Sequence, residues 1–365
     1  MVTAAPEHPP RADARGATGR TAADAVRVVG GVHAAARRRA VLVALGAGVA
    51  VLAATTAALL LGAAGVTPPE LVAALAGRGD PTTDLVVFRL RLPRVAAAVV
   101  AGIGLGLGGA LFQTTLRNPL ASPDILGVTG GASLAAVAAL LLFGVTGPAL
   151  SLAAFAGALA VAAIVWALAW RDGLTGIRFV LVGIGVASIV SGLLGWLITR
   201  ADLREAPAAL VWMVGGVSSI GWDELALAGA ALAVVVALAA AFSPRMPLLA
   251  LDDDTARGLG VDVTRARVAA ILLGVASVAV ATALTGPIAF VALVAPPVAR
   301  ALVGHGRAAL AASALVGAAV VLVADLVAQH ALGGVAVPVG IVTGLIGAPY
   351  LLWLIARDNR KGAGG

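Results

Sequence analysis

Few residues in this sequence could perform covalent chemistry or bind a metal. The chain contains no Cys, which excludes thiolate nucleophiles, thiolate metal ligands and disulfides. The four histidines are scattered, and no two of them have the spacing of metal ligands: His8, His33, His305 and His330. We therefore expect no catalytic residue, no metal site and no cofactor.

The lysine content of the chain excludes a phosphate-binding P-loop. All but one of the 25 basic residues are arginines, and the single lysine is Lys361, close to the end of the sequence. A P-loop requires the pattern Gly-x-x-x-x-Gly-Lys-Ser/Thr. That pattern cannot be formed here, so if this protein uses ATP, a partner chain hydrolyses it.

Asp325 is the one carboxylate in the middle of a long apolar segment. Ion-driven transporters usually bury several titratable groups that carry the ion or proton. A single carboxylate near the end of a segment is more typical of a helix-packing or hydrogen-bonding group. An ion-driven secondary transporter therefore remains the weaker alternative, and an intramembrane enzyme lacks the residues it would need.

The composition predicts an all-α polytopic membrane protein. Of the 365 residues, 61% are hydrophobic and only 12% are charged, with a mean hydropathy of +1.04, whereas soluble domains carry roughly 25% charged residues. Ten apolar segments have about the length needed to cross a bilayer. They are residues 40–62, 93–116, 125–143, 148–170, 176–199, 222–243, 266–285, 287–303, 308–332 and 338–356.

The basic residues predict how the chain is oriented and divided. Nineteen of the 25 lie in pieces predicted to face the cytoplasm. The other six lie in the predicted outer loops or at the outer end of a span; they are Arg78, Arg89, Arg91, Arg94, Arg200 and Arg204. This asymmetry places both termini in the cytoplasm and explains the net charge of +7 without nucleic acid. We expect a disordered tail over 1–37, a membrane domain over 38–357 and a second tail over 358–365.

Two loops have the residues of short helices outside the membrane. Thr67 and Glu70 form a capping box, with prolines in the first turn, that predicts a helix ending near Ala76. In the predicted cytoplasmic loop 244–265, three consecutive aspartates from Asp252 complement the positive end of a helix dipole. Gly258 or Gly260 could end that helix in a left-handed conformation, which gives a short projecting helix.

Glycines in two of the predicted spans favour close helix packing. Gly102 and Gly106 are four residues apart, and Gly127, Gly130 and Gly131 open the next span. Small faces let membrane helices approach closely. A role in lining a wide substrate path is the alternative interpretation.

Several stretches, in order, resemble the iron-siderophore and vitamin B12 (FecCD-type) family of ABC transporter permeases. The similarity covers roughly residues 40–357. The stretches are Arg91-Leu-Pro-Arg94; residues 117–132, which begin Arg-Asn-Pro-Leu-Ala-Ser-Pro-Asp; residues 251–260; Gly286-Pro-Ile-Ala-Phe290 with 296–300; and residues 338–349.

This resemblance implies a type II ABC importer permease fold in the bacterial inner (plasma) membrane. It implies transport of iron-siderophore complexes, with cobalamin or haem as alternatives. The implied transporter contains two permease copies, as a homodimer or heterodimer, together with cytoplasmic ABC ATPase subunits and an external substrate-binding protein. The implied roles are docking of the binding protein by Arg91 and Arg94, and a cytoplasmic gate at Thr175, Gly176 and Ile177. The implied ATPase-coupling residues are Asp252, Asp253, Asp254, Thr255, Ala256, Arg257, Leu259 and Gly260.

Three positions depart from the pattern of that family. Asp252 stands where the family usually has Gly at the start of the coupling segment. Pro297 stands where the family commonly has His, and Gln329 stands near the position of an Arg that follows an Asp-x-x-Ala element. Loss of that Arg removes one contact expected with the binding protein, so the docking surface is expected to differ in detail.

Overall fold

The computed structural model describes residues 22–62, 65–170, 176–202, 204–304, 309–331 and 337–362, and its regular elements over these ranges are all helices. Seven helical segments are long and apolar enough to cross a membrane. They correspond to α1 (Ala22–Leu60), α4 (Leu92–Thr115) with the turns before it, α6 (Pro148–Ala169), α7 (Gly176–Thr199), α9 (Trp222–Phe242) with the turns after it, α12 (Val263–Thr285) and α14 (Leu310–His330).

Three predicted spans form shorter apolar helices. They are α5 (Val128–Phe143), α13 (Val291–Val303) and the apolar part, Val339–Trp353, of α15 (Val339–Gly362). All ten predicted apolar segments are therefore helical, but not all have the length that we expected. In α5 and α13 a left-handed residue delays the first turn: Gly127 has a φ of +71° and Phe290 a φ of +66°.

The first helix begins earlier than we predicted. We expected a disordered tail up to residue 37, but α1 starts at Ala22, and residues 22–37 continue the same helix. Six of these sixteen residues are Ala, the strongest helix former, and a membrane-spanning helix directly after the stretch removes the cost of nucleation. Residues 1–21 of the predicted tail lie outside the described residues.

The helix that carries Arg91 and Arg94 also begins earlier than predicted. Instead of a loop up to residue 92, the helical segment runs from Pro81 to Thr115 through α3 (Pro81–Asp84) and a π-helical turn (Leu85–Arg91). Asp80 caps its start by accepting hydrogen bonds from the amides of Thr82 and Thr83. Pro93 cannot donate to the preceding turn, and the wider π turn accommodates it.

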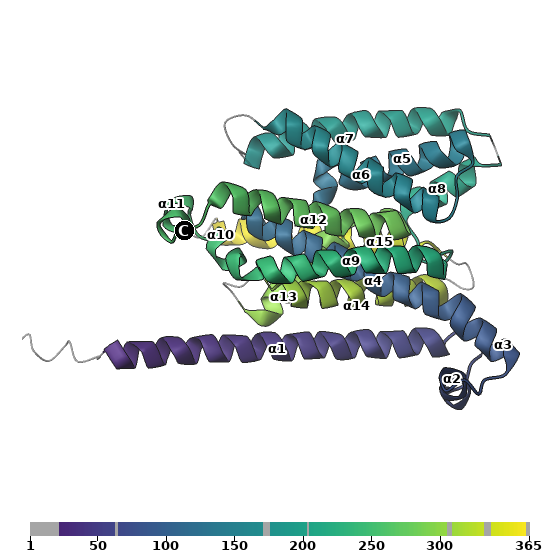
Figure 1. The fold of residues 1–365 in the computed structure, drawn as a ribbon, viewed down its shortest axis with the longest axis horizontal. Coiled ribbons are helices and arrows are strands. Elements are labelled where there is room, and N and C mark those ends of the chain that lie inside the picture. Colours follow the sequence, from purple (N-terminus) through teal and green to yellow (C-terminus); the bar gives the residue numbers. More distant parts are fainter. Residues whose placement is uncertain are drawn as a thin grey trace, which may run out of the picture.

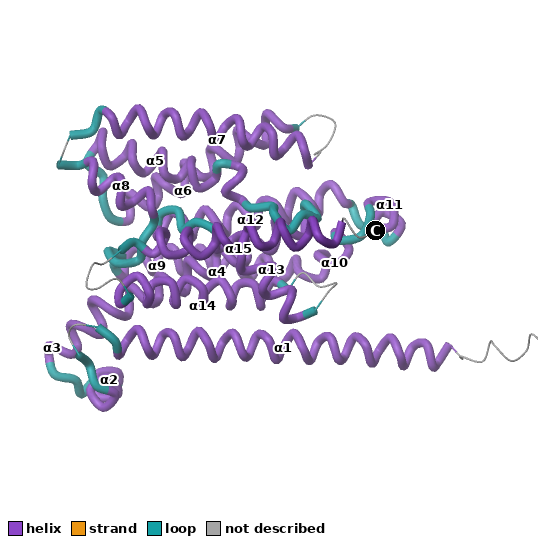
Figure 2. Tube along the Cα trace, turned by 180° about the vertical axis from the view of Figure 1, so that it is seen from behind, coloured by secondary structure: helices purple, strands orange, loops and turns teal. Residues whose placement is uncertain are grey.

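The long helices run side by side, with α4 in the interior and α1 at the edge (Figure 1). In both views α1 and α7 lie at opposite edges of the bundle (Figure 2). The most apolar window of the α4 segment is 78% buried, whereas that of α1 is 6% buried. Short helices mark the two ends: α2 (Pro68–Leu75) and α3 at one end, α10 (Met246–Leu249) and α11 (Asp253–Gly258) at the other. These ends are called the α2 end and the α11 end below.

Glycines bring the backbones of the central helices into direct contact. A Cβ atom on Gly102 would lie 2.4 Å from the Cα of Ala318 in α14, and one on Gly106 would lie 2.2 Å from the carbonyl oxygen of Ser313. Either distance is far below a van der Waals contact, so even alanine would separate α4 from α14. These glycines pack helices in the structure.

The glycines at the start of α5 act in two different ways. A Cβ on Gly131 would lie 2.5 Å from the Cγ2 of Val161 in α6, and one on Gly130 would lie 3.3 Å from Val190 in α7. Gly127 instead ends a 3₁₀ turn (Pro123–Leu126) in the left-handed conformation and changes the chain direction before α5. The predicted small face is therefore formed by Gly130 and Gly131.

Candidate functional site

The segment at the α11 end forms the short capped helix that the sequence predicts. The carboxylate of Asp252 accepts a hydrogen bond of 2.9 Å from the amide of Thr255 and thereby caps α11. At the other end Gly260, with a φ of +82°, lets the amide of Val261 bond to the carbonyl of Ala256. The cap at Thr255 holds the pKa of Asp252 below its usual value.

Asp253 connects this segment to two membrane helices. Its carboxylate lies 2.8 Å from the Nη2 of Arg117, just beyond α4, and 2.7 Å from the Nη2 of Arg267 in α12. The hydrogen bond from Arg267, together with Arg117, holds the pKa of Asp253 below its usual value, against the opposing effect of burial. This cluster was not predicted from the sequence, because Arg117 is far along the chain from Asp253 and Arg267.

Arg117 is held in a strained backbone conformation by the same cluster. Its φ is +50°, which residues other than glycine rarely adopt. Its Nε donates a hydrogen bond of 3.0 Å to the carbonyl oxygen of Leu249, in addition to the ion pair with Asp253. The turn after α4 is therefore fixed directly to α10 and α11 by two short contacts.

An exposed leucine flanks each end of α11. Leu259 is 60% exposed and Leu251 is 39% exposed, whereas Ala256 is completely buried. Asp254 and Arg257 form an exposed ion pair one turn apart, which contributes little to stability. The segment thus combines two exposed leucines with a base that is fixed to α4 and α12 through Asp253.

At the α2 end, Arg94 is engaged within the chain. Its Nη2 lies 2.8 Å from the Oδ1 of Asp325 in α14, and its Nε lies 3.0 Å from the Oδ2. The side chain of Asp325 is 3% exposed and that of Arg94 is 20% exposed. Gln329 donates a further hydrogen bond of 2.8 Å to Asp325. The interpretation of Asp325 as a helix-packing group is confirmed, and its carboxylate has three donor groups around it.

The guanidinium of Arg91 is also hydrogen-bonded within the chain, whereas that of its neighbour Arg89 makes no such contact with another described residue. The Nη1 of Arg91 donates to the carbonyl oxygen of Leu59 at the end of α1, and the side chain is half-buried. Arg89 lies two residues earlier, in the same π-helical turn, and is exposed. Within the described residues Arg89 therefore has the more accessible guanidinium of the two.

A buried polar contact lies where α13 contains two prolines. Pro296 and Pro297 lack amide protons, which leaves the carbonyls of Ala292 and Leu293 without their helical partners. Gln113 of α4 supplies the missing donor, with its Nε2 3.0 Å from the oxygen of Leu293. Its Oε1 accepts a hydrogen bond from Arg300, so the amide holds α13 and this arginine together. Gln113 could have been predicted, since it is a lone amide in an apolar span and the prolines free two carbonyls.

The remaining predicted residues are only partly described. Thr175 lies outside the described residues, Gly176 is the first residue of α7, and the side chain of Ile177 is not described. In the turn after α4, Ser122 caps the 3₁₀ turn by accepting a hydrogen bond from the amide of Asp124.

Taken together, these elements define a multi-pass helical membrane protein with a helical projection fixed at one end. A solved structure described as an inward-facing metal-chelate type ABC transporter is 28% identical to it and has a TM-score of 0.77, covering 86% of this chain and 98% of that one. The fold is thus that of an ABC transporter permease.

Comparison with known sequences identifies the family. A sequence model of the FecCD transport family matches residues 50–357. The ferric enterobactin transport system permease protein FepG of Escherichia coli is 39% identical over 82% of this chain and 91% of its own length. The vitamin B12 import system permease protein BtuC of Salmonella typhi is 36% identical over 89% of this chain and 98% of its own length. The chain belongs to the FecCD transport family.

Proposed function

We propose that this protein is the permease subunit of an ATP-driven importer of iron-siderophore complexes, with cobalamin or haem as alternative cargo. The observation that carries the proposal is the α11 projection, which is fixed to α4 and α12 through Asp253 and presents Leu259 outward. A separate ATPase subunit would contact this projection, since the chain has no P-loop lysine. The relatives named for ferric enterobactin, siderophores, ferric citrate and vitamin B12 support this class of cargo.

The proposed orientation puts the α11 end, and with it both termini, in the cytoplasm. Arg37, Arg38 and Arg39 of α1 and Arg267 of α12 belong to that end, which fits the excess of basic residues there. The α2 end then faces outward. A second permease copy, identical or related, would complete the path between the two subunits, with a gate at Thr175, Gly176 and Ile177.

The proposed docking surface for an external binding protein lies at the α2 end. The contacts of the arginines at this end support different roles for Arg94 and Arg89. Arg94 anchors α4 to α14 through Asp325, whereas exposed Arg89, with Arg91 behind it, would meet acidic side chains of the binding protein. Gln329, which stands where the family often has an arginine, would support Asp325 rather than contact the partner.

The test of coupling is Leu259→Arg combined with Gly260→Pro, reconstituted with the ATPase and binding protein. The charge would disrupt an apolar contact, and Pro cannot adopt the φ of +82° at position 260. We expect uptake and cargo-stimulated ATPase activity to fall at least tenfold, whereas Leu259→Met and Gly258→Ala retain both. Wild-type uptake and stimulated ATPase activity in the double variant would show that the coupling assignment is wrong.

A further inference from the structure

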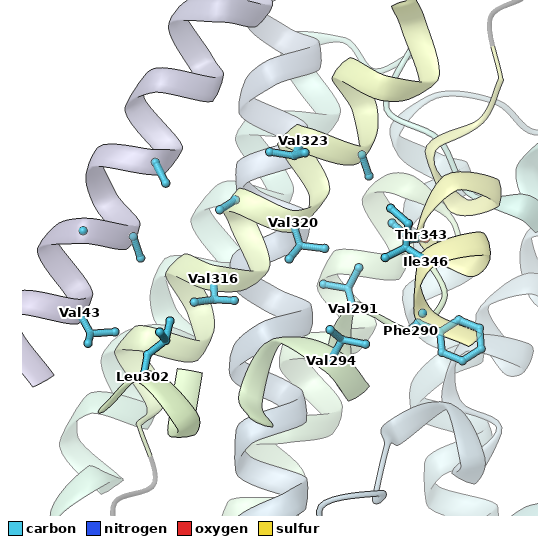
Figure 3. A pocket seen from close by; sticks show the side chains of 16 residues that line it. Val43, Phe290, Val291, Val294, Leu302, Val316, Val320, Val323, Thr343 and Ile346 are labelled. Carbon is cyan, nitrogen blue, oxygen red and sulfur yellow. The ribbon is translucent and has the colours of Figure 1, made fainter. Parts of the chain in front are cut away.

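The first helix rests against the bundle only along a narrow strip. Its inward residues are small, among them Ala36, Ala40, Ala44 and Ala47, and apolar hollows remain on both of its flanks. Figure 3 shows one of them, with Val43 of α1 facing Leu302 of α13 and Val316 of α14. That hollow has a volume of about 620 Å³. The side chains therefore leave apolar cavities beside α1, and cavities of this kind are poorly hydrated.

The hollow on the other flank is the larger, with a volume of about 870 Å³, and lies toward the α11 end. It is called the α1–α9 groove here, and its lining includes Ala36, Ala40, Ala44, Leu107, Ala240 and Ala311. Ala240 and Ala311 are exposed, so the groove reaches the lateral surface of the bundle. Its size lies within the range of about 300–1,000 Å³ that is typical of ligand pockets.

Three consecutive arginines directly follow Ala36, a lining residue of this groove. Arg37, Arg38 and Arg39 are all exposed, and no ion pair links any of them to a carboxylate among the described residues. Arg39 is used to fix α1, because its Nε donates a hydrogen bond of 2.8 Å to the carbonyl oxygen of Leu302. Arg37 directly follows Ala36 of the lining. Since each residue turns an α-helix by about 100°, Arg37 lies beside the groove face and Arg38 lies on the far side.

We propose that the α1–α9 groove binds an anionic phospholipid of the inner leaflet, with an acyl chain against the alanines and the phosphate at Arg37. The inner leaflet follows from the orientation proposed above. Basic residues beside clefts between membrane helices on the cytoplasmic side are suited to anionic headgroups. An acyl chain is the apolar occupant available at this depth, and it would complete the packing of a helix whose own contacts are few. The bound lipid holds α1 against α4, α9 and α14.

The test measures lipid retention by the purified permease alone, which separates it from any test of transport. Native mass spectrometry with added phosphatidylglycerol or phosphatidylcholine of the same acyl chains gives the preference for the anionic headgroup. We expect a clear preference in the wild type, reduced about five-fold by Arg37→Gln and less than two-fold by the matched control Arg38→Gln. Equal losses in the two variants would overturn the site, because they would reflect general attraction to surface charge.

Two further measurements test the apolar half of the proposal. Ala44→Phe fills the groove without changing charge, and we expect it to abolish retention of phosphatidylglycerol while the protein remains monodisperse. Glycerol phosphate, which carries the headgroup phosphate without acyl chains, should not displace the lipid. Retention of both lipids to equal extents by the wild type, unchanged retention in Ala44→Phe, or displacement by glycerol phosphate would each contradict the proposal.

Discussion

The contact between Arg94 and Asp325 permits a quantitative prediction, because it joins the two helices that pack most closely. The pair is bidentate, with distances of 2.8 and 3.0 Å, and Asp325 is almost completely buried. Removing one partner of a buried ion pair typically costs about 3–5 kcal/mol. We expect Arg94→Met to cost about 3–5 kcal/mol, because Asp325 then retains only the hydrogen bond from Gln329.

The two single substitutions should be unequal. Asp325→Leu should cost less, about 2 kcal/mol, because the side chain of Arg94 is 20% exposed and its guanidinium can turn toward water. The double variant, Arg94→Met with Asp325→Leu, leaves no unpaired charge. It should therefore be more stable than the sum of the single effects predicts, with an interaction energy of about 2–3 kcal/mol.

The assay is equilibrium unfolding in detergent, followed by tryptophan fluorescence, for the wild type and the three variants. Glu70→Gln serves as a control at the same end, because its hydrogen bond to the amide of Thr67 is exposed. An interaction energy close to zero would refute the argument. So would a larger loss for Asp325→Leu than for Arg94→Met.

Three other predictions concern separate parts of the molecule. Gly106→Ala should lower the free energy of unfolding by about 1–3 kcal/mol and separate α4 from α14, because the new Cβ would lie 2.2 Å from the carbonyl oxygen of Ser313. In the same unfolding assay the control Gly185→Ala should be neutral or stabilising, because nothing lies within 4 Å of a Cβ there. Gln113→Leu should lower the free energy of unfolding by about 3 kcal/mol, because it leaves the carbonyl of Leu293 and the guanidinium of Arg300 without this partner. Gln113→Glu should lose less stability, because it retains the contact with Arg300. Equal losses of stability in the two variants would contradict the role given to the contact between Gln113 and Arg300. Protection of residues 249–262 from hydrogen exchange, taken relative to the intrinsic rate of an unstructured chain at each pH, should be high above about pH 5. It should fall as the pH drops below about 4, because the lowered pKa of Asp253 makes its contribution present above the unfolded value and lost as the folded pKa is crossed. Asp253→Asn should show low protection at every pH, and a protection profile identical to that of the wild type would refute the role of Asp253.

Local signals in the sequence were sufficient for the features that depend on a few neighbouring residues. The helix after Thr67, the helix that begins at the aspartates 252–254, and its left-handed end at one of two predicted glycines follow from residues within one turn of those they affect. The ten apolar segments follow from composition alone. Each of these predictions needed no knowledge of how distant segments meet.

The contacts that fix the candidate site join residues that are distant in the sequence, and for this reason they were not predicted. Asp325 is 231 positions from Arg94, and Asp253 is 136 positions from Arg117. Each residue alone is compatible with an interfacial charge, and only the fold decides its partner. The early start of the α4 segment was missed because Pro93 resembles a helix boundary, whereas a π-helical turn accommodates it.

The most direct test of the proposed function measures what energy drives uptake. The permease, its ATPase and its binding protein are reconstituted in proteoliposomes, and accumulation of a radiolabelled ferric siderophore is followed. We expect accumulation to require ATP inside the compartment that holds the α11 end, to stop when ATP is depleted, and to continue in the presence of a protonophore. Accumulation that persists without ATP and collapses with the protonophore would contradict an ATP-driven importer and would identify an ion-driven transporter instead.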